Sequence, residues 1–202
     1  MGNINLGYYT VTHETTGGVC VDVGCNLGDF TDKYKKHFKK IYFIEPQKQL
    51  FDNLITRFEL DENIYGFNLA AWSISDIELE LVGHSNNDHG SVGVKSELLN
   101  SDWGDNVVNK VKSVDINTLF GKINEKYIDY MKIDCENSEY EFLLNKDLSN
   151  IGYIGIELHN QMGIGKYTSL IDWIQVTHEL VNGDLTYKVN WNNEVLFKNK
   201  IK

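Results

Sequence analysis

The sequence predicts an α/β protein built on a doubly wound, mainly parallel sheet. Short apolar runs rich in β-branched residues alternate with stretches of helical periodicity along most of the 202 residues, which is typical of strand–helix–strand units. A glycine-rich loop directly follows the first apolar run, where such sheets carry a ligand-binding turn. The last two extended stretches alternate polar and apolar residues, so we expect a terminal antiparallel hairpin.

Three strands are expected in the first third of the chain. After an irregular lead-in over residues 1–17, the run 19–23 is almost continuously apolar and predicts a buried parallel strand. In residues 29–39, Phe30, Tyr34 and Phe38 share one helical stripe. The lysines of this region, which are Lys33, Lys35, Lys36, Lys39 and Lys40, are interpreted as its solvated face. A strand at 41–44, a helix at about 50–58 near Pro46 and a strand at about 64–69 follow.

The middle of the chain departs from this rhythm. Residues 77–81 alternate with period two, residues 83–93 are polar and turn-rich, and residues 107–114 are expected to return as a strand. We therefore predict an insertion that bears a β-hairpin over about 77–114. The remaining predicted elements are strands at 128–134 and 151–158, helices at 140–144 and 170–180, and the antiparallel pair at 186–191 and 194–197. All of them are assigned to a single domain, 1–202.

Composition excludes several classes of function. The net charge of −10 argues against a nucleic-acid partner, because phosphate binding depends on Lys and Arg. Cys20, Cys25 and Cys135 form no CxxC pair, so neither a disulfide framework nor a zinc site is expected. No apolar run reaches the ~20 residues of a membrane span, and no secretory signal is recognised at the start. A cytoplasmic protein is therefore expected.

The first chemical motif is the loop Asp22-Val23-Gly24-Cys25-Asn26-Leu27-Gly28. Gly24 permits a tight turn and close approach of a ligand to the backbone, and Gly28 lets the next helix start near the sheet. The spacing D-x-G-x-x-x-G differs from the dinucleotide fingerprint G-x-G-x-x-G. We predict that Asp22, Gly24, Asn26 and Gly28 bind an amino-acid moiety and a ribose; the alternative is a purely structural turn.

Two further strand ends supply candidate cofactor contacts. Glu45 ends the second strand about 20 residues after the loop, where an acidic residue accepts hydrogen bonds from ribose hydroxyls. The alternative is a carboxylate favoured by the helix dipole. Asn68 ends the third strand and is assigned to the adenine side of the pocket, with ordinary turn chemistry as the alternative.

The last two motifs are acidic and histidine-containing. Asp134 lies at the carboxyl end of a predicted strand, where ligands bind in such sheets, and Glu136 and Glu139 follow it. Glu139 has a structural alternative as the residue that opens a helix. His159 ends the next strand in Ile156-Glu157-Leu158-His159 and is a candidate general base, although a lone His is more often structural.

Together these strings resemble the FkbM family of methyltransferases. The resemblance rests on six strings in the family's order: residues 21–28, 43–46, 68–70, 114–119, 131–139 and 156–159. They cover about residues 19–160. The family usually has Gly-Ala where Asn137-Ser138 stand, and the lead-in of this chain is short.

The resemblance implies a Rossmann-like class I methyltransferase fold and an S-adenosylmethionine-dependent methyltransferase (EC 2.1.1.-), with S-adenosylhomocysteine as product. The implied reaction is O-methylation of a hydroxyl on a small acceptor such as a carbohydrate or glycoconjugate. Asp22 is expected to hold the amino-acid end and Glu45 the ribose. His159 is the first candidate for the base, with Asp134 and Glu136 as orienting groups or alternative bases. No metal is expected, although a divalent cation bridging those three residues is the open alternative.

Two other classes stay open. A catalytically silent module that keeps the cofactor fold would bind the cofactor without transferring a methyl group. A nucleotide-dependent oxidoreductase would bind nicotinamide, which the absent G-x-G-x-x-G disfavours. His84 and His89, in the insertion, are interpreted as solvent-exposed residues. Neither the acceptor nor the oligomeric state follows from the sequence.

Overall fold

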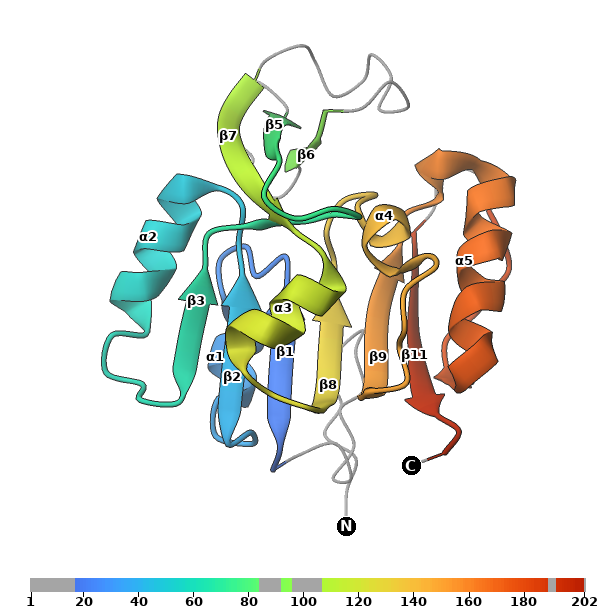
Figure 1. Ribbon diagram of the computed structural model, residues 1–202, viewed down its shortest axis with the longest axis horizontal. Helices are drawn as coiled ribbons and strands as arrows, with labels where there is room; N and C mark the ends of the chain where they lie inside the picture. The colour runs from blue at the N-terminus through green and yellow to red at the C-terminus, as the bar shows by residue number, and fades with distance from the viewer. Residues whose placement is uncertain (1–16, 84–91, 96–106, 189–191, 202) are drawn as a thin grey trace.

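A computed structural model describes residues 17–83, 92–95, 107–188 and 192–201 of the chain. Its main sheet has seven strands in the order β10-β11-β9-β8-β1-β2-β3, seen along the lower part of Figure 1. The strands are β1 (Val19–Val23), β2 (Lys40–Ile44), β3 (Ile64–Phe67), β8 (Ile128–Ile133), β9 (Ile151–Leu158), β10 (His178–Asn182) and β11 (Asn193–Asn199). Strands β9, β8, β1, β2 and β3 run parallel, whereas β11 runs antiparallel to both β9 and β10. The predicted sheet with a terminal antiparallel pair is therefore confirmed.

Helices cover both faces of this sheet, as a doubly wound fold requires. They are α1 (Asp29–Tyr34), α2 (Lys48–Arg57), α3 (Ile116–Ile123), α4 (Glu139–Leu143) and α5 (Gly163–Thr177), with the short 3-10 helix η2 (Asn160–Met162) before α5. One large apolar cluster joins α3, α4 and α5 to the sheet, and two smaller clusters join α1 and α2 to its other face. In Figure 1, α3 lies in front of β1 and α1 lies behind the sheet. The sheet is thus buried between two helical layers.

The predicted insertion forms a second sheet. Its strands are β4 (Ala70–Ala71), β5 (Glu78–Gly83), β6 (Val92–Val94) and β7 (Val107–Val114), in the order β4-β7-β5-β6. β5 pairs antiparallel with both β6 and β7, which confirms a hairpin-bearing insertion. Figure 1 shows this small sheet above the carboxyl ends of β1, β2 and β8. It therefore covers the edge at which ligands bind in α/β folds.

Two predicted elements are placed differently in the structure, and helix α3 was not predicted at all. The first strand of the terminal pair is β10 at His178–Asn182, not residues 186–191, of which 189–191 lie outside the described residues. The predicted helix 170–180 is α5, which begins earlier, at Gly163, and ends at Thr177. Helix α3 was not predicted, although the Asp115 side chain caps it by accepting from the N–H groups of Asn117 and Thr118.

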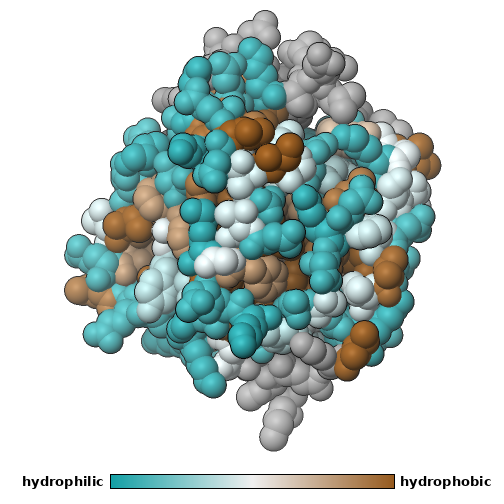
Figure 2. All heavy atoms as spheres, viewed as in Figure 1, coloured by the Kyte–Doolittle hydropathy of each residue, from teal (hydrophilic) through white to brown (hydrophobic). Residues whose placement is uncertain are grey.

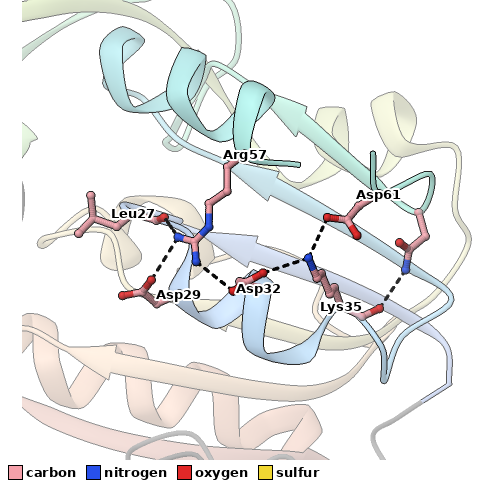
Figure 3. A network of polar contacts seen from close by, with 7 residues as sticks. Leu27, Asp29, Asp32, Lys35, Arg57 and Asp61 are labelled. Carbon is pink, nitrogen blue, oxygen red and sulfur yellow. Dashed lines mark hydrogen bonds and ion pairs between the residues drawn. The ribbon is translucent and has the colours of Figure 1, made fainter. Parts of the chain in front are cut away.

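The lysines of residues 33–40 do not form the predicted helix face, because α1 ends at Tyr34 and not at residue 39. Only Lys33 lies on the helix; Lys35, Lys36 and Lys39 follow it in irregular chain, and Lys40 begins β2. Tyr34 and Phe38 are buried, while Lys33, Lys36 and Lys39 are exposed. Lys35 is the exception, because its Nζ lies 3.0 Å from Asp32 and 2.9 Å from Asp61. The other residues of this network are shown in Figure 3.

The same network connects the glycine-rich loop to α2 through the only arginine. The guanidinium of Arg57 donates to the Leu27 carbonyl and pairs with Asp29 at 3.2 Å and Asp32 at 3.0 Å (Figure 3). These surface ion pairs are worth little individually. Together with the backbone contact at Leu27 they fix how α1 leaves the loop.

The surface is mostly polar on the face shown in Figure 2, where apolar residues form small separate groups. None of the helices among the described residues is long and apolar enough to cross a membrane.

The strand order indicates where a ligand site is expected. This is the switch point between β1 and β8, because the chain winds outward from there in both directions.

Candidate active site

A pocket opens at this switch point, between the main sheet and the small sheet. The loops after β1, β2 and β8 contribute Gly24, Asn26, Glu45, Asp134 and Glu136 to its lining. Residues 69–71 line a second side, and Leu81, Val92 and Val94 of the small sheet close the top. The insertion is therefore part of the pocket, and five of the predicted site residues meet there.

Gly24 is required by the close approach of two strand ends. Its φ is +75°, and a Cβ at this position would lie 1.7 Å from the backbone oxygen of Asp134. Gly28 also has a positive φ, +86°, and its Cβ would meet Leu54 of α2 at 2.5 Å. Gly28 is not among the lining residues, so its visible function is to bring α1 against α2.

Glu45 and Asn26 form the polar floor of the pocket. The Glu45 carboxylate accepts from the backbone N–H of Asn26 and of Gln47, each at 2.8 Å. Its side chain is only 2% exposed, and this burial raises the pKa of Glu45 to about 7 against the opposing effect of the two N–H donors. The Asn26 Oδ1 is buried without a hydrogen-bond partner among the described residues, which leaves it available to a ligand.

Asp22 lies behind this floor and not in the pocket lining. It is fully buried, accepts from the Thr31 hydroxyl at 2.8 Å and lies 3.3 Å from the Nζ of Lys132. Lys132 in turn donates to the carbonyl of Gly24 at 2.6 Å and lies 3.6 Å from Asp134. Burial lowers the pKa of Lys132, but Asp22 and Asp134 raise it by more, so the ammonium is charged. Asp22 thus positions the loop through Lys132.

Asn68 also acts on backbone. Its Nδ2 donates to the carbonyls of Glu45 and Pro46, at 2.9 and 3.0 Å. The side chain therefore braces the turn that carries Glu45, while its neighbours Leu69 and Ala70 line the pocket. Its predicted contact with the adenine side stays a prediction.

His159 lies outside the pocket lining, where two carboxylates hold it. Its Nε2 lies 3.2 Å from Glu136 and its Nδ1 3.1 Å from Glu139, whose carboxylate also accepts the His159 backbone N–H at 2.9 Å. The Tyr140 hydroxyl donates to the His159 carbonyl at 2.7 Å. Burial lowers the pKa of His159, but Glu139 and Glu136 raise it by more, to well above its ordinary value. The imidazole is therefore cationic in this arrangement.

Glu139 combines both interpretations of its sequence position. It is the first residue of α4, as the structural alternative predicted, and it is completely buried against His159. It orients the imidazole from behind, whereas Glu136 contacts it from the pocket side.

Two further carboxylates were not singled out in the sequence. Glu157 precedes His159 by two residues on β9, and Glu194 of β11 is its antiparallel partner. Burial, followed by the charge of Asp134, raises the pKa of Glu157. Burial, followed by the charges of Glu157 and Asp134, raises the pKa of Glu194 to about 7. The two-residue spacing of Glu157 and His159 places them on one face of a strand, and this was the signal available in the sequence.

Five of the predicted residues line the pocket: Gly24, Asn26 and Glu45, here called the first end, and Asp134 and Glu136, here called the second end. His159 contacts Glu136 from outside the lining. Asp22, Gly28 and Asn68 support the first end from outside the lining. His84 and His89 lie outside the described residues.

The first end fits the cofactor that the sequence implied. A buried carboxylate can accept both hydroxyls of a ribose, the unpartnered Asn26 Oδ1 accepts a further donor, and Gly24 leaves the backbone open to close approach. A doubly wound sheet with an antiparallel β11 and this pocket defines the α/β Rossmann-like fold of S-adenosylmethionine-dependent methyltransferases.

Comparisons with known proteins give the family. The model of the methyltransferase FkbM domain matches residues 22–182, and the chain belongs to this family. The chain therefore carries a domain of a methyltransferase family, and its fold implies S-adenosylmethionine as cofactor. A comparison with curated proteins gave no match.

Solved structures support the same fold. The methyltransferase FkbM from Methylobacillus flagellatus is similar with a TM-score of 0.53 and 15% identity, over 90% of this chain and 43% of that protein. The chain thus spans less than half of that relative. A fibrillarin pre-rRNA processing protein from Methanococcus jannaschii has a TM-score of 0.57 and 10% identity, over 96% and 71% of the two chains. An Aeropyrum pernix fibrillarin with natively bound S-adenosylmethionine has a TM-score of 0.51 and 9% identity, over 91% and 68%.

Proposed function

We propose that this chain transfers the methyl group of S-adenosylmethionine to a hydroxyl oxygen of a small acceptor, of which a carbohydrate or glycoconjugate is the first candidate. The observation that carries the proposal is that Glu136, which His159 contacts from outside the lining at 3.2 Å, lines the same pocket as Glu45 and Asn26. A hydroxyl acceptor has a proton to lose, and the second end supplies groups that can orient it and receive that proton.

The first end of the pocket holds the cofactor. Glu45 accepts the ribose hydroxyls on the lone pairs that Asn26 N–H and Gln47 N–H leave free, and Asn26 Oδ1 accepts one further donor. Asp22 acts on the amino-acid end through Lys132 and the Gly24 carbonyl. When bound, S-adenosylmethionine supplies an electrophilic methyl group on its sulfonium.

Glu136 is the base that the geometry favours. His159 is only 1% exposed, and carboxylates engage both of its ring nitrogens, so the protonated imidazole has no free lone pair. Glu136 is more exposed, with 21% of its side chain accessible, and it lines the pocket. His159 then positions Glu136, and Asp134, paired with Lys132, orients the acceptor.

The charge of the site favours a neutral acceptor. Five carboxylates, those of Asp134, Glu136, Glu139, Glu157 and Glu194, gather around the second end, where Lys132 and His159 are the cationic partners. A polyanion such as RNA would be repelled there and by the net charge of −10. A sugar hydroxyl carries no charge and finds hydrogen-bond acceptors at this edge.

Transfer of a labelled methyl group from S-adenosylmethionine to a panel of sugars and glycoconjugates tests the proposal. We expect label on a hydroxyl oxygen with the unaltered protein and a kcat about 10²-fold lower with Glu136→Gln, because a general base contributes about that much. Glu141→Gln is the matched control, since Glu141 lies on α4 and pairs with Lys166 away from the pocket lining.

Two results would contradict it. Cofactor binding without transfer to any hydroxyl acceptor would favour the catalytically silent module. Full turnover by Glu136→Gln and by His159→Gln would remove the assigned residues from the reaction.

A further inference from the structure

We propose that Asp134, Glu157 and His159 form a divalent-cation site that adjoins the pocket lining at Asp134. Each residue offers a ligand atom, and these atoms all lie within 4.8 Å of one another. No other group of this kind occurs among the described residues. Two carboxylate oxygens and one imidazole nitrogen at that spacing can be drawn onto one ion by small side-chain rotations.

The backbone brings the three residues together. β8 and β9 are parallel neighbours whose last paired residues are Ile133 and Ile156. Asp134 and Glu157 each follow one residue later, and His159 lies two residues beyond Glu157. Because alternate residues of a strand share a face, Glu157 and His159 point in one direction from β9, toward the end of β8.

Each candidate ligand is held from outside the triad. Nδ1 of His159 faces the buried Glu139 at 3.1 Å, and Nε2 faces Glu136 at 3.2 Å. In the metal-free protein Nε2 therefore carries a proton; a bound ion would take the place of that proton, and the Nε2 lone pair would then turn from Glu136 to the ion. Asn192 donates to Oε1 of Glu157 at 2.8 Å, which leaves Oε2 available. Lys132 contacts Oδ2 of Asp134 at 3.6 Å. A histidine that donates one ring N–H to a carboxylate and offers the other nitrogen is the usual arrangement around protein-bound metals.

The local charge also favours a cation. Glu194 lies directly opposite Glu157 in the β11–β9 ladder, and like charges in this position destabilise a sheet. Glu136 contacts the same imidazole. A divalent ion bound to Asp134, Glu157 and His159 would offset this repulsion.

The ligand set selects the kind of ion. Carboxylates suit Mg²⁺, Ca²⁺ and Mn²⁺, whereas imidazole suits transition metals. A mixed set of two oxygens and one nitrogen therefore fits Mn²⁺ best among the ions that take several oxygen ligands. Three protein ligands leave open positions on such an ion. If the proposed function holds, on which this role rests, those positions face the acceptor and bind its hydroxyl together with an adjacent oxygen.

Binding of Mn²⁺ alone tests the site, without cofactor or acceptor. Titration of the chelator-treated protein, followed by the loss of the electron paramagnetic resonance signal of free Mn²⁺, should show one saturable site. We expect Glu157→Gln and His159→Gln each to weaken binding by more than about tenfold. Asp172→Asn, an exposed carboxylate on α5, is the matched control and should leave the affinity unchanged.

The Glu157→Gln variant should keep the fold, because Glu157 is only partly buried and Gln preserves its size. Circular dichroism should show this variant folded. Absence of saturable Mn²⁺ binding by the unaltered protein, or equal affinity in a folded Glu157→Gln, would overturn the cation site.

A failure of the proposed function can be distinguished from a failure of the cation site. Saturable Mn²⁺ binding without any hydroxyl methylation would support the cation site and contradict the reaction. Methyl transfer by a protein that shows no saturable Mn²⁺ binding would overturn the site and support the reaction.

Discussion

The affinity for S-adenosylmethionine should fall as the pH is lowered from 8 to 6, because Glu45 must be ionised to accept both ribose hydroxyls. Burial raises the pKa of this carboxyl to about 7. Its ionised fraction therefore drops from about 0.9 at pH 8 to about 0.1 at pH 6. The dissociation constant should rise about tenfold over this interval, which corresponds to about 1.4 kcal/mol.

The raised pKa of Glu45 also predicts how the stability of the ligand-free protein depends on pH. Stability should fall as the pH rises, whereas the affinity for the cofactor should increase. The pKa of Glu45 in the folded state, about 7, lies above its ordinary value of 4.5. Its contribution to stability is therefore fully present below pH 4.5 and is lost as the pH rises through 7. The loss is at most about 3 kcal/mol, since each pKa unit corresponds to 1.36 kcal/mol. Glu45→Gln should remove this slope from the free energy of unfolding.

Calorimetric titration at several pH values and constant ionic strength measures the affinity, and urea unfolding measures the stability. Any pH dependence that remains in Glu45→Gln comes from other groups, including the amino group of the ligand. The difference between the two proteins therefore gives the effect of Glu45 alone. An affinity that is independent of pH, or an equal slope in the variant, would refute the role of the ionised carboxylate.

Three further predictions follow from the residues around Glu45. Gly24→Ala should cost more than about 4 kcal/mol in urea unfolding, because its Cβ would meet the Asp134 carbonyl, whereas Gly163→Ala, also at positive φ but with open space around it, should cost about 1–2 kcal/mol; equal costs would contradict the steric argument. Lys132→Met should destabilise the protein by about 3–5 kcal/mol, because it leaves Asp22 buried and unpaired, and a change below 1 kcal/mol would contradict this. Asn26→Gly keeps the positive φ but removes Oδ1, so the dissociation constant for S-adenosylmethionine should rise about fivefold to tenfold for one lost hydrogen bond; an unchanged constant would place Oδ1 outside the contact.

The elements predicted best from the sequence were the strands buried on both faces. Residues 19–23, 41–44 and 151–158 are almost continuously apolar, and such runs have few alternatives in a doubly wound sheet. β10 was misplaced because only His178 of its five residues is buried, so its sequence carries little strand periodicity. The start of α5 was missed because Gly163 and Gly165 indicate a loop, although a helix covers both.

Five of the predicted site residues share one pocket, but the direction of the other side chains was not predicted. The strand ends placed Asp134 and Glu45 at the pocket because parallel strands present ligands at one edge. Asp22 lies one residue before the end of β1 and Asn68 one residue after the end of β3. Asp22 faces α1 through Thr31, whereas Asn68 braces the Glu45 turn. That distinction depends on tertiary contacts that no local pattern records.

The most direct test of the central claim is calorimetric titration of the purified protein with S-adenosylmethionine and S-adenosylhomocysteine, with NAD as a control and Glu45→Ala alongside. We predict saturable binding of the first two ligands, weakened in Glu45→Ala, and no binding of NAD. Absence of binding, or binding of NAD alone, would contradict the assignment of this pocket to the methyl donor.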